Sequence, residues 1–281
     1  VLDRLSLETI YLSFIRPLLE YGDVVFDNCT AKEKETIEKV QYEAARIVSG
    51  ATKLVSITKL MSEVGWESLD ARRHQHKLVL FYKMTNNLAP PYLSEILPDP
   101  SNEQSYNLRH QDRFRAPRAL TTLYYNSFLP SSTRAFNDLR EDIRNSQTLS
   151  LFKQNISPNI EKPPKYYYYG KRKLQIMYTR LRTNCSSLAD DLFRKNIILS
   201  PLCVCGQRET SRHFFFSCTQ YQGIRLQLIN SIRAYSHVTL DTILFGNLTL
   251  TNQDNEKIFL AVHKYIDKSN RFDDRQNYHL G

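Results

Sequence analysis

The sequence lacks long hydrophobic runs and is poor in cysteine, glycine and proline. Its longest apolar stretches, such as Leu78–Tyr82 and Ile197–Leu199, are far shorter than the roughly 20 residues that a membrane-spanning helix requires. Five cysteines in 281 residues exclude a small disulfide scaffold, and 8 glycines with 11 prolines exclude a fibrous or low-complexity chain. The 41% of apolar residues is ordinary for a globular protein, so a soluble fold with no membrane partner is expected.

The amino terminus lacks the charged, apolar and small-residue zones of a secretory signal. It also lacks Met and opens inside a helical pattern, which predicts that the sequence is a fragment of a longer chain. Three of the five cysteines lie within the 16 residues Cys203–Cys218, and such a local cluster is typical of a reducing compartment. An intracellular location, nuclear or cytoplasmic, is therefore expected.

Basic residues are unevenly distributed. The chain carries 38 Lys and Arg against 29 Asp and Glu, a net charge of +9. Residues 101–182 hold 15 of the basic and 6 of the acidic residues, whereas the net charge is −2 in residues 1–100 and +2 in residues 183–281. An excess confined to the middle of the chain predicts an anion-binding surface there, and nucleic acid is the obvious anion.

Residues 1–97 have helical periodicity, which predicts amphipathic helices that share a core. The clearest helix covers about 31–49, because Thr30 and Glu33 form a capping box before it and Gly50 follows its end. Further expected features are a short helix near 57–64 that stops at Gly65, a longer helix capped by Ser68, and a kink near Ile15 caused by Pro17.

The remaining chain divides into two regions. Seven prolines between Pro98 and Pro164 interrupt the pattern, so residues 98–172 are expected to be an irregular basic connector with one helix at about 131–144. Helical periodicity returns in residues 173–281, which predict a small helical domain around the cysteine cluster. The fold class expected for the whole chain is mainly α.

Four potential metal ligands lie close together in the carboxy-terminal region. They are Cys203, Cys205, His213 and Cys218, spaced Cys-x-Cys-x7-His-x4-Cys. Three thiolates and one imidazole form the ligand set of a closed structural zinc site, because four tetrahedral S or N donors leave no open position for catalysis. The first pair has a single intervening residue and needs a tight turn, which Gly206 would allow.

The spacing of the second pair also imposes a condition. On a regular helix His213 and Cys218 would point about 140° apart, so the helix must end or bend near Ser217. The alternative is a cluster without metal, made of two buried thiols, a surface histidine and an unrelated cysteine. Phe214–Phe216 are interpreted as core side chains of this region rather than base-stacking residues.

Residues Lys165–Lys173 interleave four tyrosines with four cations. Cations neutralise phosphates and aromatic faces stack on unpaired bases, so this composition suits RNA or single-stranded DNA. An extended strand with alternate tyrosines packed on the core is the other interpretation, and the arginines at 109–118 form either a second contact or a solvated face. The candidate nucleic-acid-binding residues are Lys165, Tyr166, Tyr168, Lys171, Arg172, Lys173, Arg109, Arg113, Arg115 and Arg118.

Several motifs follow one another in order: Ile10–Gly22, Gln41–Ala51, Gly65–Leu69, Ser127–Pro130 and Cys203–Cys218. Together they resemble the carboxy-terminal portion of a LINE-type (non-LTR), jockey-like retrotransposon reverse transcriptase. Arg72-Arg73, Phe136-Asn137, Glu209-Thr210 and Arg271-Phe272 fit the same pattern, although Phe136 replaces the usual Trp.

The resemblance implies a thumb-like helical region at 1–97 and a zinc-binding tail that helps to hold template RNA or target DNA. Its partner would be a polymerase palm and fingers that this sequence does not contain. Polymerase activity is not implied, because the palm carboxylates that hold two metal ions are missing. The only adjacent aspartates, Asp190-Asp191 and Asp273-Asp274, do not lie in a Tyr-x-Asp-Asp turn.

No other enzyme is indicated either. His74 and His76 are accompanied by no nucleophile, carboxylate pair or Gly-rich phosphate loop, and are interpreted as helix surface or packing residues, with no small-molecule substrate. The expected function is a non-catalytic, nucleic-acid-binding fragment with structural zinc. The alternative is a stand-alone or decayed helical zinc protein that serves protein–protein contacts.

Overall fold

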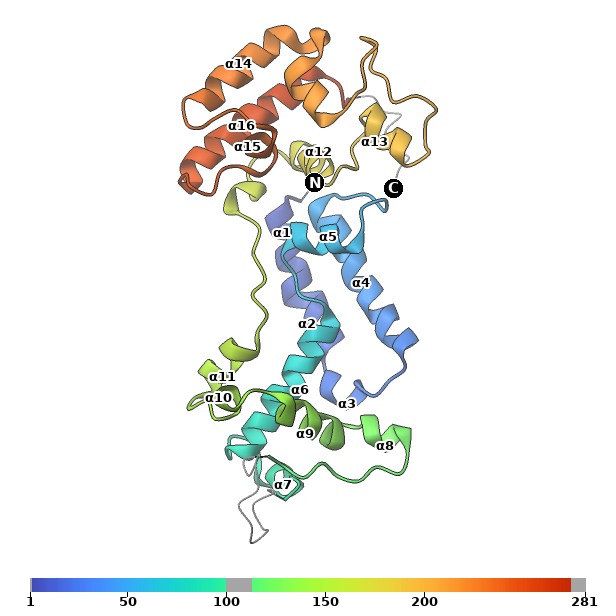
Figure 1. Cartoon of the computed structure of the whole chain (residues 1–281), viewed down its shortest axis with the longest axis vertical. Helices are drawn as coiled ribbons and strands as arrows, with labels where there is room; N and C mark the ends of the chain where they lie inside the picture. Colours follow the sequence, from blue (N-terminus) through green and yellow to red (C-terminus); the bar gives the residue numbers. More distant parts are fainter. Residues whose placement is uncertain (1, 100–112, 274–281) are drawn as a thin grey trace. The chain divides into compact units, whose positions relative to one another are not determined.

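The computed structural model describes residues 2–99 and 113–273, and its regular elements are helices (Figure 1). Within these ranges no strand forms, and one isolated antiparallel bridge pairs Leu202 with Arg208. The expectation of a mainly α fold is therefore confirmed. None of the helices in the described ranges combines the length and apolar character needed to cross a bilayer.

The helices form two compact units, each assembled from segments that are distant in sequence. Unit 1 contains residues 1–13, 42–66 and 161–281, and unit 2 contains residues 14–41 and 67–160. This division differs from the consecutive regions 1–97, 98–172 and 173–281. The expected connector is split between the units because its aromatic side chains pack into two different cores, Phe114 and Phe152 in unit 2 and Tyr166 in unit 1.

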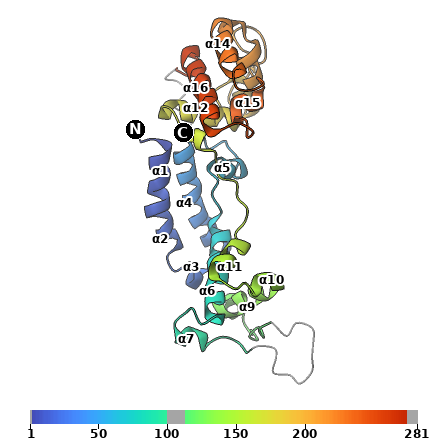
Figure 2. The same cartoon turned by 90° about the vertical axis from the view of Figure 1, so that its left-hand side faces the viewer.

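In unit 2, α6 (Leu69–Thr85) contacts both α9 (Phe128–Asp138) and α11 (Leu149–Ile156), as Figure 2 shows. Stacked and tilted rings fill the contacts: the ring centroids are 4.2 Å apart for Tyr82 and Phe152 and 5.0 Å apart for Phe81 and Phe136. The other helices of this unit are α2 (Arg16–Glu20), α3 (Asp23–Phe26), α7 (Pro91–Ser94), α8 (Thr122–Asn126) and α10 (Glu141–Arg144).

Local sequence signals placed most helix ends correctly. The helix α4 covers Ala31–Ser49, and the Thr30 backbone N–H donates to the Glu33 carboxylate at 2.8 Å, which confirms the capping box. The helix α5 (Ile57–Val64) ends at Gly65, whose φ of +65° suits glycine. Before Pro17 the chain forms the π-helical segment η1 (Tyr11–Ile15), so the predicted kink takes the form of a widened turn.

The prediction of a single helix at about 131–144 is wrong. The chain forms α9 and α10 instead, because Leu139 is extended with ψ of 151° and ends α9. Arg144 stabilises this break by donating from its Nη1 to the carbonyl of Asn137 at 3.0 Å. A buried cation from the next helix thus satisfies a carbonyl at the end of α9, which periodicity alone does not reveal.

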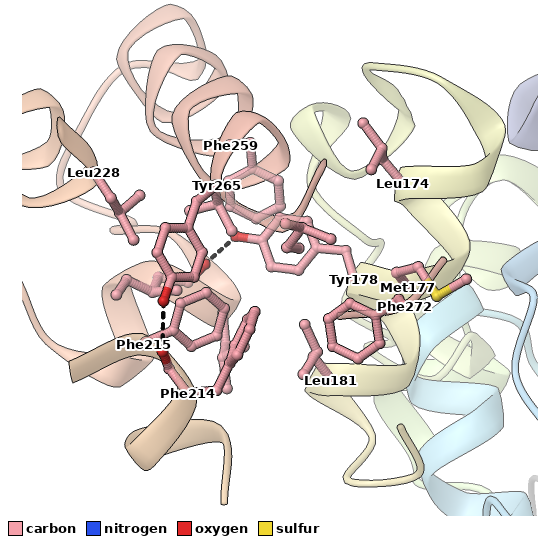
Figure 3. Packing of buried hydrophobic residues seen from close by; sticks show 14 of the residues in the cluster. Leu174, Met177, Tyr178, Leu181, Phe214, Phe215, Leu228, Phe259, Tyr265 and Phe272 are labelled. Carbon is pink, nitrogen blue, oxygen red and sulfur yellow. Dashed lines mark hydrogen bonds between the residues drawn. The ribbon is translucent and has the colours of Figure 1, made fainter. Parts of the chain in front are cut away.

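The core of unit 1 lies between α12 (Arg172–Arg182), α14 (Gln222–Arg233), α15 (Leu240–Phe245) and α16 (Asn252–Ser269). Figure 3 shows its aromatic centre, where Phe214, Phe259 and Tyr265 are almost fully buried. The Tyr265 hydroxyl donates to the carbonyl of Phe214 at 2.5 Å, so the buried phenol is satisfied. Unit 1 also contains α5 and the end of α4. Its other helices are α1 (Arg4–Ile10), α13 (Ala189–Arg194), η3 (Lys165–Tyr168), η4 (His213–Ser217) and η5 (Thr219–Tyr221).

A buried ion network joins the three segments of unit 1. Glu63 accepts from Arg4 Nη1 at 2.8 Å and from Arg182 Nη2 at 2.6 Å, and the exposed fraction of each of the three side chains is 6% or less. Burial raises the pKa of Glu63, but the two guanidinium groups lower it by more, so its pKa lies below the ordinary value. The carboxylate is therefore ionised in the folded protein at neutral pH.

Glu63→Gln is expected to lower the free energy of unfolding by about 3–5 kcal/mol, because it leaves two buried cations without a counter-charge. Since the pKa of Glu63 is lowered on folding, its contribution is present above the unfolded value of about 4.3 and is lost as the pH falls through the folded value. Urea unfolding at pH 7 and pH 3 measures both effects. The exposed Glu161 supplies the control Glu161→Gln, and a loss below about 1 kcal/mol for Glu63→Gln would contradict the assignment.

Candidate metal centre and cationic residues

The first pair of cysteines lies in a tight turn. The Cys203 N–H donates to the carbonyl of Gln207 and the Gly206 N–H donates to the carbonyl of Cys203, both at 2.8 Å. Gly206 has φ of +84°, a conformation that a residue with a Cβ adopts only with strain. The bridge between Leu202 and Arg208 closes the base of this turn, so a spacing of one residue still brings both thiols to one site.

The second pair is brought together by a π-helical turn. The segment η4 runs from His213 to Ser217, and the Cys218 N–H donates to the carbonyl of His213 at 2.9 Å. Residues five apart lie one above the other in such a turn, whereas an α-helix would separate them. The expectation that regular helix could not continue past Ser217 is confirmed, and the deviation from α-helical geometry begins at His213 itself.

The four ligand atoms lie within 4.8 Å of one another. The Cys203 and Cys218 sulfurs are 3.7 Å apart, the Cys205 and Cys218 sulfurs 4.0 Å, and the Cys205 sulfur is 3.3 Å from His213 Nε2. At typical zinc distances of about 2.3 Å to sulfur and 2.1 Å to nitrogen, tetrahedral ligand atoms lie roughly 3.6–3.8 Å apart. The cluster therefore has the size and donor set of a four-coordinate metal site.

The protonation of the cluster follows from its burial. Burial raises the pKa of the Cys203 thiol to about 12, whereas a hydrogen bond from the Gln207 backbone lowers the pKa of Cys205. Burial also lowers the pKa of His213, which keeps the imidazole neutral and its lone pair available. A metal ion must displace protons from such thiols, so metal affinity should rise with pH.

Charged side chains hold the backbone around the cluster. Arg225 Nε donates to the carbonyl of Phe215 at 3.1 Å, and its Nη2 donates to the carbonyl of Cys218. Glu209 accepts from Arg271 through Nε at 2.6 Å and Nη2 at 2.7 Å, and from the Ala189 N–H at 2.7 Å. This bidentate pair joins the turn to the end of the described chain and to the start of α13.

Tyr169 is exposed, whereas the other three tyrosines of the Lys165–Lys173 segment pack inward. They form the 3-10 helix η3 rather than an extended strand, and Tyr166 is only 2% exposed, with its hydroxyl donating to the carbonyl of Phe245 at 2.9 Å. Tyr168 is half-buried and donates to Glu8 at 2.7 Å. The Tyr166 ring packs against Phe259 in the core, with the ring centroids 4.7 Å apart. Its faces are therefore not available to stack on a base.

The cations of the same segment have different roles. Lys165 and Lys171 are exposed and make no ion pair with the described residues. Arg172 instead donates to the carbonyl of Val48 at 2.8 Å, near the end of α4, and Lys173 pairs with Asp273. Two of the four predicted cationic contacts therefore already have protein partners.

The second predicted cluster belongs to unit 2. Arg115 and Arg118 are exposed, Arg113 is half-buried, and Arg109 lies outside the described residues. The backbone around Arg113 and Arg115 is anchored because Asn137 exchanges two hydrogen bonds with the backbone of Phe114, at 3.0 and 2.8 Å. The two groups of predicted cations thus lie on different units.

Comparisons with known proteins do not assign the chain to a family: no protein-family model matches it, and neither a curated protein nor a solved structure gives a significant match. Function must therefore be inferred from the side chains themselves. Sequence reasoning identified the four ligands of the metal cluster but missed Arg225, whose distance of seven residues from Cys218 forms no recognised motif. Arg271 was noticed only as part of the family pattern, and its pairing with Glu209 follows from the fold.

Cys203→Ser is expected to weaken metal binding at least about a hundredfold, because it removes one of four donors and leaves a poor hydroxyl ligand. The matched control is Cys185→Ser, since Cys185 is also buried but lies outside the cluster. Chelator competition followed by elemental analysis measures the affinity. Equal metal retention by the two variants would mean that this cluster does not bind the metal.

Proposed function

We propose that this chain is a non-catalytic, nucleic-acid-binding portion of a LINE-type reverse transcriptase, stabilised by zinc at the cysteine–histidine cluster. The observation that carries the proposal is the convergence of four donor atoms within 4.8 Å from a tight turn and a π-helical turn. Both segments depart from regular geometry in the way that brings the donors together. A cluster of unrelated thiols would not require the tight turn at Cys203 or the π-helical turn η4.

Zinc is the metal that this donor set suits best. Three thiolates and one imidazole are soft and borderline ligands, and zinc imposes no geometry other than the tetrahedral one they already approach. When bound, zinc would supply cross-linking between the turn at Cys203 and η4, with all four positions filled by protein. The expected content is one zinc ion per chain, and its removal should destabilise unit 1.

Two features support the nucleic-acid role. Lys165 and Lys171 remain exposed without ion pairs among the described residues, and Arg115 and Arg118 are also exposed. Such cations can neutralise phosphates, which is the sequence-independent part of nucleic-acid affinity. Tyr166 and Tyr167 contribute by holding this segment against the core of unit 1 rather than by stacking on bases.

The family-like motifs also have a structural relationship. Glu209 and Arg271 form a bidentate pair, and the rings of Phe214 and Phe272 lie 5.5 Å apart, edge to face. Residues of the motif that are about 60 positions apart in the chain are thus mutual partners. This arrangement supports the interpretation of Cys203–Phe272 as one structural module of the proposed family.

Affinity for a 30-nucleotide single-stranded RNA is expected to fall as salt rises. Lys165→Gln with Lys171→Gln should flatten the slope of log affinity against log salt by about 1.4, since each phosphate contact on a single strand contributes about 0.7. Fluorescence anisotropy at several salt concentrations gives the slope. Lys257→Gln is the control, because Lys257 is exposed but paired with Asp254. Salt-independent binding, or none, would exclude the nucleic-acid role.

Exposed apolar side chains favour a second candidate function, protein–protein contact. In unit 2, Phe14, Leu18, Tyr21 and Val25 are each 70–85% exposed within one short stretch. Apolar groups gathered in this way are typical of interaction sites. In the proposed family the palm of the polymerase would be the partner, and in a stand-alone protein it would be another chain.

Self-association is the simplest form of this second function. Sedimentation velocity over a range of concentrations should show a dimer at micromolar concentrations, and Leu18→Asp should abolish it by placing a charge on the contact. The control Leu120→Asp alters an equally exposed leucine of the same unit outside this stretch. A wild-type chain that stays monomeric throughout would argue against association of the chain with itself.

A further inference from the structure

Unit 1 contains a cavity of about 610 Å³ whose lining does not include any residue of the candidate metal centre. Its volume lies within the range of about 300–1,000 Å³ that is usual for small-molecule sites. One wall is the exposed side of α5, a second is the segment Glu161–Pro164, and a third is the loop that follows α15. The lining includes Lys59, Ser62, Lys162, Arg182, Phe245 and Leu248.

A buried cation forms part of the lining. The Arg182 side chain is 2% exposed, and its guanidinium carbon lies 3.9 Å from the centre of the Tyr167 ring. Its Nε and Nη2 donate to Glu63 at 3.1 and 2.6 Å, whereas its Nη1 has no acceptor among the described residues. A guanidinium held by two of its nitrogens is fixed in orientation and keeps one donor nitrogen for a ligand.

The charge around the cavity is unbalanced. Lys59 and Lys162 are exposed and make no ion pair within the described part of the chain. Glu63 is shared between Arg182 and Arg4, so it cannot neutralise both, and Glu161 is the other carboxylate of the lining. Three lining cations against two lining carboxylates favour an anionic ligand, and the walls of a cavity strengthen that preference.

A further part of the lining is apolar. Phe245 and Leu248 line the cavity and are 45% and 80% exposed, although they belong to the end of a helix and the loop after it. Pro163 and Pro164 add rigid apolar surface. The Ser62 hydroxyl on α5 adds a group able to donate or accept a hydrogen bond. A ligand that satisfies both sides carries an anionic group next to a flat, largely apolar ring.

We propose that this cavity binds a nucleotide, with the phosphate at Lys59, Lys162 and Arg182 and the base against Phe245 and Leu248. The proposal rests on the proposed nucleic-acid-binding function and places one nucleotide of the strand at a defined site. A free nucleoside monophosphate has the same chemistry as one unit of a single strand. The two sources are distinguished by testing both.

The experiment compares the wild-type chain with the double variant Lys59→Gln, Lys162→Gln. Both lysines are exposed and unpaired, so their substitution should leave the thermal melting temperature unchanged. The probes are AMP, adenosine, inorganic phosphate and a five-nucleotide oligoadenylate, and binding is measured by ligand-observed NMR and fluorescence anisotropy. Lys257→Gln is the control, since Lys257 does not line the cavity.

AMP is expected to bind at least about tenfold more tightly than adenosine or phosphate alone, because only AMP satisfies both walls. The double variant should weaken AMP binding about tenfold or more, and the control should not. An equal loss for the oligonucleotide assigns the site to one unit of a strand, whereas a loss confined to AMP assigns it to free nucleotide.

Two results would overturn the inference. If the oligonucleotide binds equally well to the wild type and the double variant while AMP does not bind, the cavity is not the site and the proposed nucleic-acid role stands. If neither probe binds, the cavity holds no nucleotide. The 30-nucleotide RNA titration then decides separately whether the nucleic-acid role fails as well.

Discussion

The pairing of one buried carboxylate with two buried guanidinium groups determines how unit 1 is assembled. Glu63, Arg4 and Arg182 come from the three separate segments of this unit, and each would be costly to bury alone. Because the carboxylate is outnumbered, the arginines also use the faces of Tyr167 and Tyr168 as neighbours. The same imbalance leaves positive charge at the adjoining cavity. The buried ion network and the candidate binding site therefore share Glu63 and Arg182.

Around the cysteine–histidine cluster, stability and ligand geometry depend on different parts of the chain. The aromatic core places Phe214 and Phe215 inside unit 1, which fixes η4 and thereby His213. The turn at Cys203 contributes the Cys203 side chain to the core and is held further by backbone hydrogen bonds and by the Glu209–Arg271 pair. A metal would connect these two parts, which explains why a small turn at the surface is constrained so closely.

Tyrosine has a double role in this protein. Its rings fill the core of unit 1, and its hydroxyls satisfy backbone carbonyls at the ends of helices, as Tyr166 does at Phe245 and Tyr265 does at Phe214. The tyrosines and the lysines of the segment Lys165–Lys171 therefore have different functions. The rings of Tyr166, Tyr167 and Tyr168 stabilise the fold, and the cations at Lys165 and Lys171 remain for partners in solution.

The bounds of α4 and α5 and the four residues of the candidate metal cluster could be predicted from the sequence, because caps, glycine C-caps and ligand spacing act over a few residues. The capping box at Thr30 and Glu33 and the end of α5 at Gly65 are examples. The division of the region 131–144 into two helices could not be predicted. The extended conformation of Leu139 is accompanied by a hydrogen bond from Arg144, in the following helix, to the carbonyl of Asn137. Only the tertiary structure decided which tyrosines are buried, which cations are already paired, and that Lys59, Lys162 and Arg182 line one cavity. Those outcomes depend on contacts between residues about 20 to 160 positions apart, and local sequence carries no signal for such contacts.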